Sequence, residues 1–249
     1  PETADRKRLV SASTAFKTII NYQNDVGTSP VINKIAAMAN LALGRLFFST
    51  RQYQVAVRYY DQVDDEDPNW LQSVFEVSWV YYQLKRYGRA LGNLHTLNSP
   101  FFEDQYFPES RVLQALILFY NCRYDEANAV IKTFVQDYYP LMTELGDEIR
   151  QIPDPNAFYK WLARLSLAEE TDFSARFKRI FNAALADRRL RRKFVFTKTL
   201  TDELKRLDEL AASDSVAEPF LSTLKGELFA YRDLIIGEAG SLAQARLKR

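Results

Sequence analysis

A short motif that recurs three times is the feature that most restricts how this chain can fold. In each copy a tyrosine lies three residues before an alanine. The copies are Tyr53 and Ala56, Tyr87 and Ala90, and Tyr124 and Ala127. The alanines are separated by 34 residues (90 − 56) and then by 37 residues (127 − 90), which fits a 34-residue period with a three-residue insertion. A constant period of this length predicts a repeat protein, in which each unit packs on its neighbours.

Apolar residues at helical spacing lie on both sides of every copy. Before the motif they occupy residues 39–48, 74–82 and 112–119, and after it residues 55–63, 90–97 and 127–135. A small residue, namely Gly44, Ser78 or Ala115, lies twelve positions before each alanine, where it would let two helices approach closely. Each unit is therefore predicted to be an antiparallel helix pair whose tyrosine fills the space at the turn. The chain has only 8 glycines and 9 prolines, which suits an all-α fold.

In period and pattern these units resemble the tetratricopeptide repeat family, with about three units over residues 37–140. Gly44, Ala56 and Pro68 of the first unit resemble the glycine, alanine and terminal proline of that family. The third unit departs from the pattern at Gln114, where an apolar residue is usual. The resemblance implies an α-solenoid of stacked helix pairs that binds another protein.

The resemblance also implies where a partner would bind, because the first helix of each stacked unit lines the concave surface of such an array. The implied groove is mostly apolar and aromatic. It consists of Arg45, Phe48, Gln72, Phe75, Trp79, Tyr82, Leu116, Phe119 and Tyr120. We expect it to hold an apolar or amphipathic segment of a partner, or to be filled by the chain's own terminal helices. Members of the family that bind a peptide's terminal carboxylate use Lys, Arg and Asn here, and only Arg45 fits that pattern.

The insertion between the second and third units falls in residues 98–108, which are rich in aromatic side chains. They are Phe101, Phe102, Tyr106 and Phe107. A solvated loop does not need so many rings. These residues are expected either to pack over the edge of the groove or to form a contact loop for a partner.

The chain on either side of the repeats is also predicted to be helical. Residues 1–30 are expected to form an N-terminal helix, either a cap or part of a further repeat, before repeats over residues 31–140. Residues 141–249 are expected to form a C-terminal helical bundle or long helical hairpin. Within it, the break at residues 152–155 provides Asp154 or Asn156 as a helix cap.

Three further elements are expected in the C-terminal region. One helix is expected to begin at Ser174 and run through Arg188 to about Leu210, with a possible bend at its β-branched residues 195–201. A loop at residues 211–217 would follow. The last long helix would begin near Pro219 and extend to about Leu247.

The residues that most enzymes and metal sites need are scarce. The chain has one histidine, His95, and one cysteine, Cys122, so a zinc site and an internal disulfide are excluded. It has no glycine-rich phosphate loop and no serine nucleophile motif. We therefore expect a protein that is not an enzyme and that holds no metal or cofactor. A hydrolase with a carboxylate site at Glu169, Glu170 and Asp172 is a further hypothesis that depends on clustered acids alone.

One dense group of basic residues suggests an alternative function. The basic cluster consists of Arg188, Arg189, Arg191, Arg192 and Lys193. It is expected either to form a solvated helix face or to bind nucleic acid, an anionic surface or an acidic partner. The formal net charge of the whole chain is only +1, and no aromatic platform is predicted beside the cluster, so nucleic acid is the less expected partner.

The sequence gives only indirect indications of the compartment. No segment is predicted to cross a membrane. The chain does not begin with methionine, and it is similar to exported repeat proteins of bacterial envelopes. A place in a larger assembly of the bacterial cell envelope, in the periplasm, is therefore expected, with the cytoplasm as the alternative. The pattern leaves the oligomeric state and the identity of the partner open.

Overall fold

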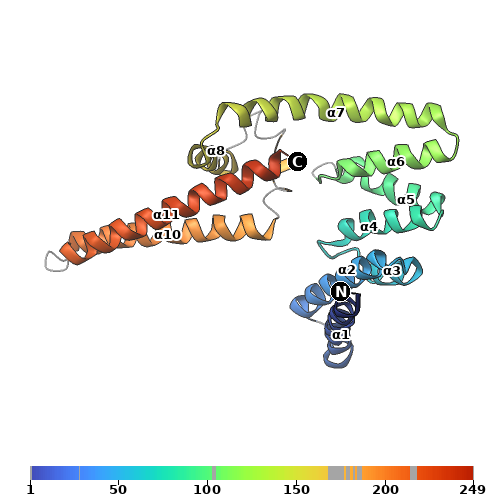
Figure 1. The fold of residues 1–249 in the computed structure, drawn as a ribbon, viewed down its shortest axis with the longest axis horizontal. Coiled ribbons are helices and arrows are strands. Elements are labelled where there is room, and N and C mark those ends of the chain that lie inside the picture. Colours follow the sequence, from blue (N-terminus) through green and yellow to red (C-terminus); the bar gives the residue numbers. More distant parts are fainter. Residues whose placement is uncertain are drawn as a thin grey trace. The chain divides into compact units, whose positions relative to one another are not determined.

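The computed structural model describes residues 2–27, 29–102, 105–167, 177, 180, 181, 183, 187–213 and 218–248. Every regular element in this part of the chain is a helix, which confirms the all-α fold class (Figure 1). The chain divides into two compact units. Unit 1 contains residues 1–103 and 107–134, and unit 2 contains residues 104–106 and 135–249.

Unit 1 is a succession of helices, each in contact with the next up to the sixth. They are α1 (Glu2–Val26), α2 (Pro30–Ser49), α3 (Tyr53–Tyr60), α4 (Trp70–Gln83), α5 (Tyr87–Leu97), a single 3-10 turn η1 (Pro100–Phe102), α6 (Pro108–Tyr120) and the first part of α7 (Tyr124–Gln151). Besides these sequential contacts, α2 touches α4 and α4 touches α6. The first helices of the three predicted units therefore form one layer. Each unit's second helix begins at the tyrosine of its motif.

One conformation recurs at the three turns between paired helices. Arg51, Lys85 and Cys122 have backbone φ angles of 60°, 57° and 58°, the left-handed region that non-glycine residues rarely adopt. In each turn the following residue donates its N–H to a carbonyl five positions earlier. These bonds join Gln52 to Phe47 (2.8 Å), Arg86 to Tyr81 (2.8 Å) and Arg123 to Leu118 (2.9 Å). This is the Schellman ending of a helix, repeated at the period of the motif.

The small residue predicted in each first helix lies where the two helices of a pair meet. Gly44 faces Tyr60 of α3, and a Cβ added at Gly44 would lie 2.7 Å from atoms of the Tyr60 ring. Ser78 and Ala115, at the corresponding positions, are buried. The motif alanines Ala56, Ala90 and Ala127 are buried as well. The predicted close approach of the paired helices is confirmed for the first pair by this contact.

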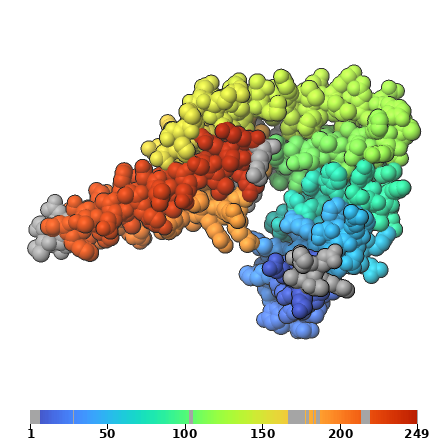
Figure 2. Space-filling model, in the orientation of Figure 1, coloured from blue at the N-terminus to red at the C-terminus, as the bar shows by residue number. Residues whose placement is uncertain are grey.

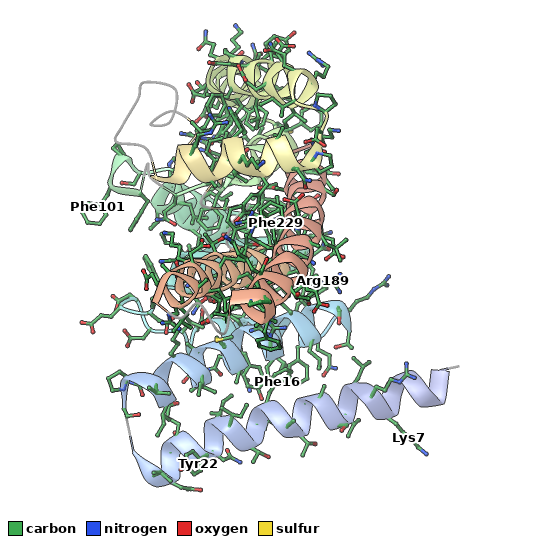
Figure 3. The ribbon with its side chains drawn as sticks, turned by 90° about the vertical axis from the view of Figure 1, so that its left-hand side faces the viewer. Lys7, Phe16, Tyr22, Phe101, Arg189 and Phe229 are labelled. Carbon is green, nitrogen blue, oxygen red and sulfur yellow. The ribbon has the colours of Figure 1, made fainter. Side chains whose placement is uncertain are left out.

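Helix α2 is the one described helix that is long and apolar enough to cross a membrane, judged by length and composition alone. In the structure it packs against α1, α3 and α4, and its residues Ala36, Leu41 and Leu43 are buried. Phe16 lies on the side of α1 that faces α2 (Figure 3). These contacts bury one side of α2, whereas Val31, Ile35 and Met38 are exposed. The expectation that no segment spans a membrane stays a prediction.

Unit 2 is built on a long helical hairpin. Helices α10 (Arg188–Ser213) and α11 (Glu218–Leu247) lie side by side, and α8 (Pro155–Leu167) packs on α11 (Figures 1 and 2). The core joins the second part of α7 to α8 and to the base of the hairpin. Its buried members include Leu145, Ile149, Phe158, Leu162, Phe177, Phe181, Leu190 and Ala243.

The backbones of α11 and α8 are in direct contact where α11 crosses the start of α8. A Cβ added at Gly240 would lie 1.9 Å from the carbonyl oxygen of Pro155, so only glycine fits there. Four residues further along, Gln244 donates from Nε2 to the carbonyl of Ile152 (2.9 Å). This amide satisfies the carbonyl left open where α7 ends, and it ties α11 to the turn between α7 and α8.

Several of the boundaries predicted in the C-terminal region can be compared with the structure, and two of them are wrong. Asp154 caps α8 by accepting the N–H of Ala157 (2.7 Å), as expected. Pro219 is the second residue of α11, which confirms the predicted start. A continuous helix through Arg188 is wrong, because α10 begins there, and Ser174 lies outside the described residues. Asp187 starts the new helix, since its carboxylate accepts the N–H groups of Arg189 and Leu190.

Two further expectations concern the middle and the end of α10. The helix is unbroken across residues 195–201, so the bend is absent there. The hydroxyls of Thr197, Thr199 and Thr201 bond to carbonyls four residues earlier. The first part of the loop predicted at 211–217 is wrong, because residues 211–213 are the end of α10, and residues 214–217 lie outside the described part.

Helix α7 belongs to both units. It runs unbroken from Tyr124 to Gln151 and contains Pro140, the residue at which the repeats were expected to end. The two compact units divide at residues 134 and 135. The division of the chain into functional domains at residues 30 and 140 stays a prediction.

Candidate functional site

The same pair of aromatic rings meets across each of the three turns. Phe48 contacts Tyr53 with centroids 5.7 Å apart, and the corresponding pairs are Tyr82 with Tyr87 (6.1 Å) and Phe119 with Tyr124 (5.3 Å). We call each pair an aromatic clasp. In every clasp the first ring belongs to the first helix of the unit and the second ring is the motif tyrosine. The clasp therefore joins the two helices on either side of the turn, whose left-handed residue stays exposed.

The second and third clasps join into one surface. Tyr82 contacts Tyr120 with centroids 6.0 Å apart, Trp79 contacts Tyr82 edge-on, and Phe119 contacts Tyr120. Burial raises the pKa of Tyr82, and the neighbouring hydroxyl of Tyr120 acts in the same direction. We call this surface the aromatic patch. Its members are Trp79, Tyr82, Tyr87, Phe119, Tyr120 and Tyr124.

The patch is most open on the third unit. Phe119, Tyr120 and Tyr124 are 57%, 58% and 56% exposed, while Trp79 and Tyr82 are half-buried. Val112 lies two helical turns before Phe119 on α6 and is also exposed. Leu116, between them, is half-buried and packs on the core of unit 1. The predicted groove residues of α4 and α6 are thus largely brought together.

Two predicted groove residues have a different role. Arg45 of α2 makes a two-pronged ion pair with Glu76 of α4, at 2.5 and 2.8 Å. Glu76 also accepts hydrogen bonds from the hydroxyl of Tyr60 (3.0 Å) and from Nε2 of Gln72 (2.5 Å). The bond to Glu76 raises the pKa of Arg45, and burial raises the pKa of Tyr60. Arg45 therefore joins two neighbouring units, whereas Gln72 bonds to Glu76 within α4. The polar groups of both residues are occupied within the protein.

The aromatic residues of the insertion separate into packed and exposed ones. Phe107 packs on Phe75 of α4 with centroids 5.4 Å apart, so the chain itself covers that groove residue. Phe102 packs on Trp70 (6.1 Å). Phe101 is 85% exposed and points away from the body of unit 1 (Figure 3). In unit 2, Tyr106 contacts Tyr138 (6.1 Å).

The basic cluster lies at the start of α10 and borders a surface groove of about 970 Å³ in unit 2. Side chains of α10, α11 and the first turn of α8 line this groove. They are Asn156, Arg189, Arg192, Lys193, Asp233, Leu234, Gly237, Glu238, Ser241 and Leu242. Lys193 forms an ion pair with Glu238. The lining contains two acidic and two leucine side chains beside the basic ones, so the groove is a mixed surface rather than a purely basic one.

No arrangement in the described part of the chain indicates catalysis. No three His, Cys, Asp or Glu side chains there lie close enough to hold a metal ion. His95 is exposed on α5. Glu169, Glu170 and Asp172 lie outside the described residues. The expectation that the protein is not an enzyme and holds no metal or cofactor stays a prediction.

Two members of the aromatic patch were not predicted as site residues. Tyr87 and Tyr124 mark the repeat in the sequence, yet each also adds a ring to the patch. The signal that could have identified them is an aromatic residue five positions earlier, at Tyr82 and Phe119. No family model, curated protein or solved structure matches this chain.

Proposed function

We propose that this chain is a non-enzymatic interaction protein of tetratricopeptide-like repeats, which binds an apolar or amphipathic segment of another protein on the aromatic patch. The carrying observation is the continuous run of rings from Trp79 to Tyr124. Three of its members are more than half exposed although they are large and apolar. Exposed aromatic clusters of this kind are typical of protein-binding surfaces.

The stacking of the units supports the repeat assignment. Ser73 of α4 is buried and donates to the carbonyl of Tyr60 (2.8 Å), at the end of the preceding pair. Ser110 of α6, 37 residues later (110 − 73), is buried and donates to Oδ1 of Asn98 (2.8 Å). The same side chain thus joins successive pairs twice, at the spacing of the motif. Turns, clasps and junctions all share one period, as in a solenoid of repeats.

Charged side chains at the rim of the aromatic patch indicate which charge a bound segment would carry beside its apolar residues. Lys85, Arg86 and Arg123 are exposed at the turns beside the clasps. Arg123 pairs with Glu126, whereas Lys85 and Arg86 form no ion pair among the described residues. A partner segment that carries an acidic residue next to its apolar side chains would therefore gain charge complementarity.

The proposal is tested with a displayed peptide library selected in two arms. Wild-type protein and a Phe119→Ala/Tyr120→Ala double variant are each presented to the library. Because both side chains are largely exposed, the variant is expected to fold, and circular dichroism checks this. Peptides that only the wild type retains are expected to combine aromatic or branched apolar residues with acidic ones.

A synthetic peptide of the enriched type then provides the quantitative test by calorimetry. Tyr120→Ala is expected to raise its dissociation constant about tenfold or more, as for a central aromatic contact. Phe101→Ala is the matched control, an exposed ring outside the patch, and should leave the constant unchanged. Libraries that give the same peptides in both arms would refute binding at the patch.

The wider role, as one part of a larger assembly in a bacterial envelope, depends on this proposed function. Its test is fractionation of cells that make the protein, followed by cross-linking of intact cells. Recovery in the envelope fraction with a defined neighbour supports it, and recovery in the cytoplasm alone contradicts it.

A further inference from the structure

The α10–α11 hairpin of unit 2 has apolar side chains on a side that no described residue covers. One side of α11 is buried against α10 and α8 through Ile235, Ile236 and Ala239. A second row of apolar residues follows heptad spacing along α11 and is exposed. It consists of Phe220 (70%), Leu224 (37%), Tyr231 (48%) and Leu234 (59%). A helix with two apolar sides requires a further partner beyond the one it already has.

This row, which we call the hairpin stripe, extends onto α10. Phe196 of α10 is 40% exposed and contacts Tyr231 edge-on, with centroids 5.9 Å apart. At the base of the hairpin the stripe leads into the groove of about 970 Å³, whose lining includes Leu234, Arg189 and Arg192. The stripe and the groove are therefore parts of one face of the hairpin.

The intervals between the residues of the hairpin stripe are nearly the same in either direction along α11. Its intervals along α11 are four, seven and three residues. If a second copy of α11 is laid antiparallel and centred at Glu227, Phe220 of one copy meets Leu234 of the other, and Leu224 falls one residue from Tyr231. A heptad row that matches its own reverse can form the seam of an isologous interface.

The two ends of the hairpin carry opposite charges, as an antiparallel pairing of two copies requires. Residues 188–198, at the base, contain six basic residues and no acidic one. Residues 207–213 and 218–224, toward the other end of the two helices, contain three acidic residues and no basic one. Residues 199–206, between them, contain two of each sign.

The register of the hairpin is fixed by two ion pairs, Lys193 with Glu238 and Lys225 with Asp208. With this register, the antiparallel pairing centred at Glu227 places the basic base of one copy beside the acidic tip of the other. Neither Arg189 nor Arg192 forms an ion pair among the described residues, although the charge of Arg189 also acts on the Asp187 carboxylate. Apolar matching and the charges at the two ends of the hairpin therefore favour the same alignment, against the repulsion of the two Glu227 carboxylates at the axis.

We infer that the hairpin stripe is a homodimer interface. Two copies of the chain pack their α10–α11 hairpins antiparallel as a four-helix bundle, with a twofold axis beside Glu227. Phe220 at the tip of each copy enters the groove at the base of the other, between Leu234 and the two arginines. The basic cluster then serves self-association and not the binding of nucleic acid.

Sedimentation of the full chain over a range of concentrations is the first test. A reversible monomer–dimer equilibrium that weakens with added salt is expected. Phe220→Glu should raise the dimer dissociation constant about tenfold or more, because it removes an apolar anchor and places a charge in the seam. Phe101→Glu, which changes another largely exposed ring in unit 1, is the control and should leave dimerisation unchanged. A chain that stays monomeric at all concentrations overturns the inference.

Disulfide trapping tests the antiparallel alignment itself. In a Cys122→Ser background, Glu227→Cys lies beside the axis and is expected to cross-link with itself. Phe220→Cys and Leu234→Cys should each stay uncross-linked alone but should cross-link when the two variants are mixed. Self-cross-linking of Phe220→Cys, without cross-linking in the mixture, would establish a parallel dimer and overturn the alignment.

Charge reversal separates self-association from nucleic-acid binding. Arg189→Glu/Arg192→Glu should weaken the dimer, and mixing with a Glu209→Lys/Glu218→Lys variant should restore association between the two variants. Circular dichroism confirms folding of each. If the arginine variant dimerises normally but loses affinity for a single-stranded oligonucleotide, the cluster binds nucleic acid and the inference is wrong.

Discussion

Gly44 and Tyr60 are packed so closely that a single added carbon at Gly44 would lie 2.7 Å from the tyrosine ring. The relation repeats along the chain in altered form. Ser78 occupies the position of Gly44 in the second unit, and there the position of Tyr60 is taken by Leu94. The smaller residue, Gly44, therefore faces the larger side chain, Tyr60, and the larger residue, Ser78, corresponds to the smaller Leu94. Close packing of the paired helices produces such compensation.

Gly44→Ala is expected to destabilise unit 1 by about 1–3 kcal/mol, because overpacking outweighs the gain in helix propensity. Adding Tyr60→Leu should recover part of that loss, and urea unfolding of the four variants in a double-mutant cycle measures the coupling. Gly92→Ala in α5 is the control, since a Cβ there meets nothing within 4 Å. Equal effects at the two glycines would contradict the packing account.

The left-handed turns predict an unusual stabilising substitution. Lys85→Gly should raise the free energy of unfolding by about 1 kcal/mol, because glycine adopts a φ of 57° without steric cost. Arg86→Gly, one residue later, should lower it, since Arg86 has a φ of −88° and glycine only adds entropy to the unfolded chain. Chemical denaturation of both variants checks the sign of each change.

Removing the ion pair between Arg45 and Glu76 of neighbouring units is expected to cause a modest loss of stability. Glu76→Gln removes the charge that Arg45 and Tyr60 both contact, and unit 1 should lose about 1 kcal/mol. The arginine is more than half exposed, so solvent screens the pair and limits the effect. Glu126→Gln, which breaks the exposed pair with Arg123 at the start of α7, should change stability less. Thermal unfolding of both variants makes the comparison.

The crossing of α11 over α8 predicts a large loss from one methyl group. Gly240→Ala should destabilise unit 2 by about 3 kcal/mol or more, because its Cβ would overlap a backbone carbonyl that no rotamer change can move. Gly226→Ala, in the same helix, meets nothing within 4 Å and should stabilise it by up to about 1 kcal/mol. Amide hydrogen exchange in α8 distinguishes the two, and similar protection in both variants would refute the contact.

The start of α10 predicts a dependence on pH. The backbone N–H of Leu190, followed by the charge of Arg246, lowers the pKa of the Asp187 carboxyl. A lowered folded-state pKa stabilises the fold above the ordinary value of about 3.9, and this contribution is lost as pH falls through the folded-state pKa. Asp187→Ala should therefore lower the melting temperature at pH 7, and the difference from wild type should shrink below about pH 4. A difference that is constant across this range would contradict the role of the charge.

How far the sequence predicts the fold depends on whether the relevant interaction is local. The helix pairs, their turns and the motif alanines follow from spacing, because residues three or four apart share a helix face. Asp154 and Asp187 have equally good capping chemistry. Only Asp154 was recognised, since a proline on each side marks that break, whereas Asp187 lies within a continuous helical pattern.

The candidate site shows the same limit. Trp79, Tyr82, Phe119 and Tyr120 were identified from their places in the repeat, and ring contacts join them in the structure. Arg45 occupied an equivalent place, but its partner Glu76 is 31 residues away, and no local pattern indicates that pair. Phe75 likewise is covered by Phe107, a residue of the insertion that the repeat does not contain.

The two rings of the third aromatic clasp lie on either side of the only cysteine in the sequence, Cys122. Cys122 is exposed at the left-handed position between Phe119 and Tyr124, and no other cysteine competes with it for a reagent. A maleimide fluorophore placed there would sit at the edge of the aromatic patch in the native sequence. Its emission would then respond to occupancy of the patch, so ligands can be screened optically without introducing a reporter residue.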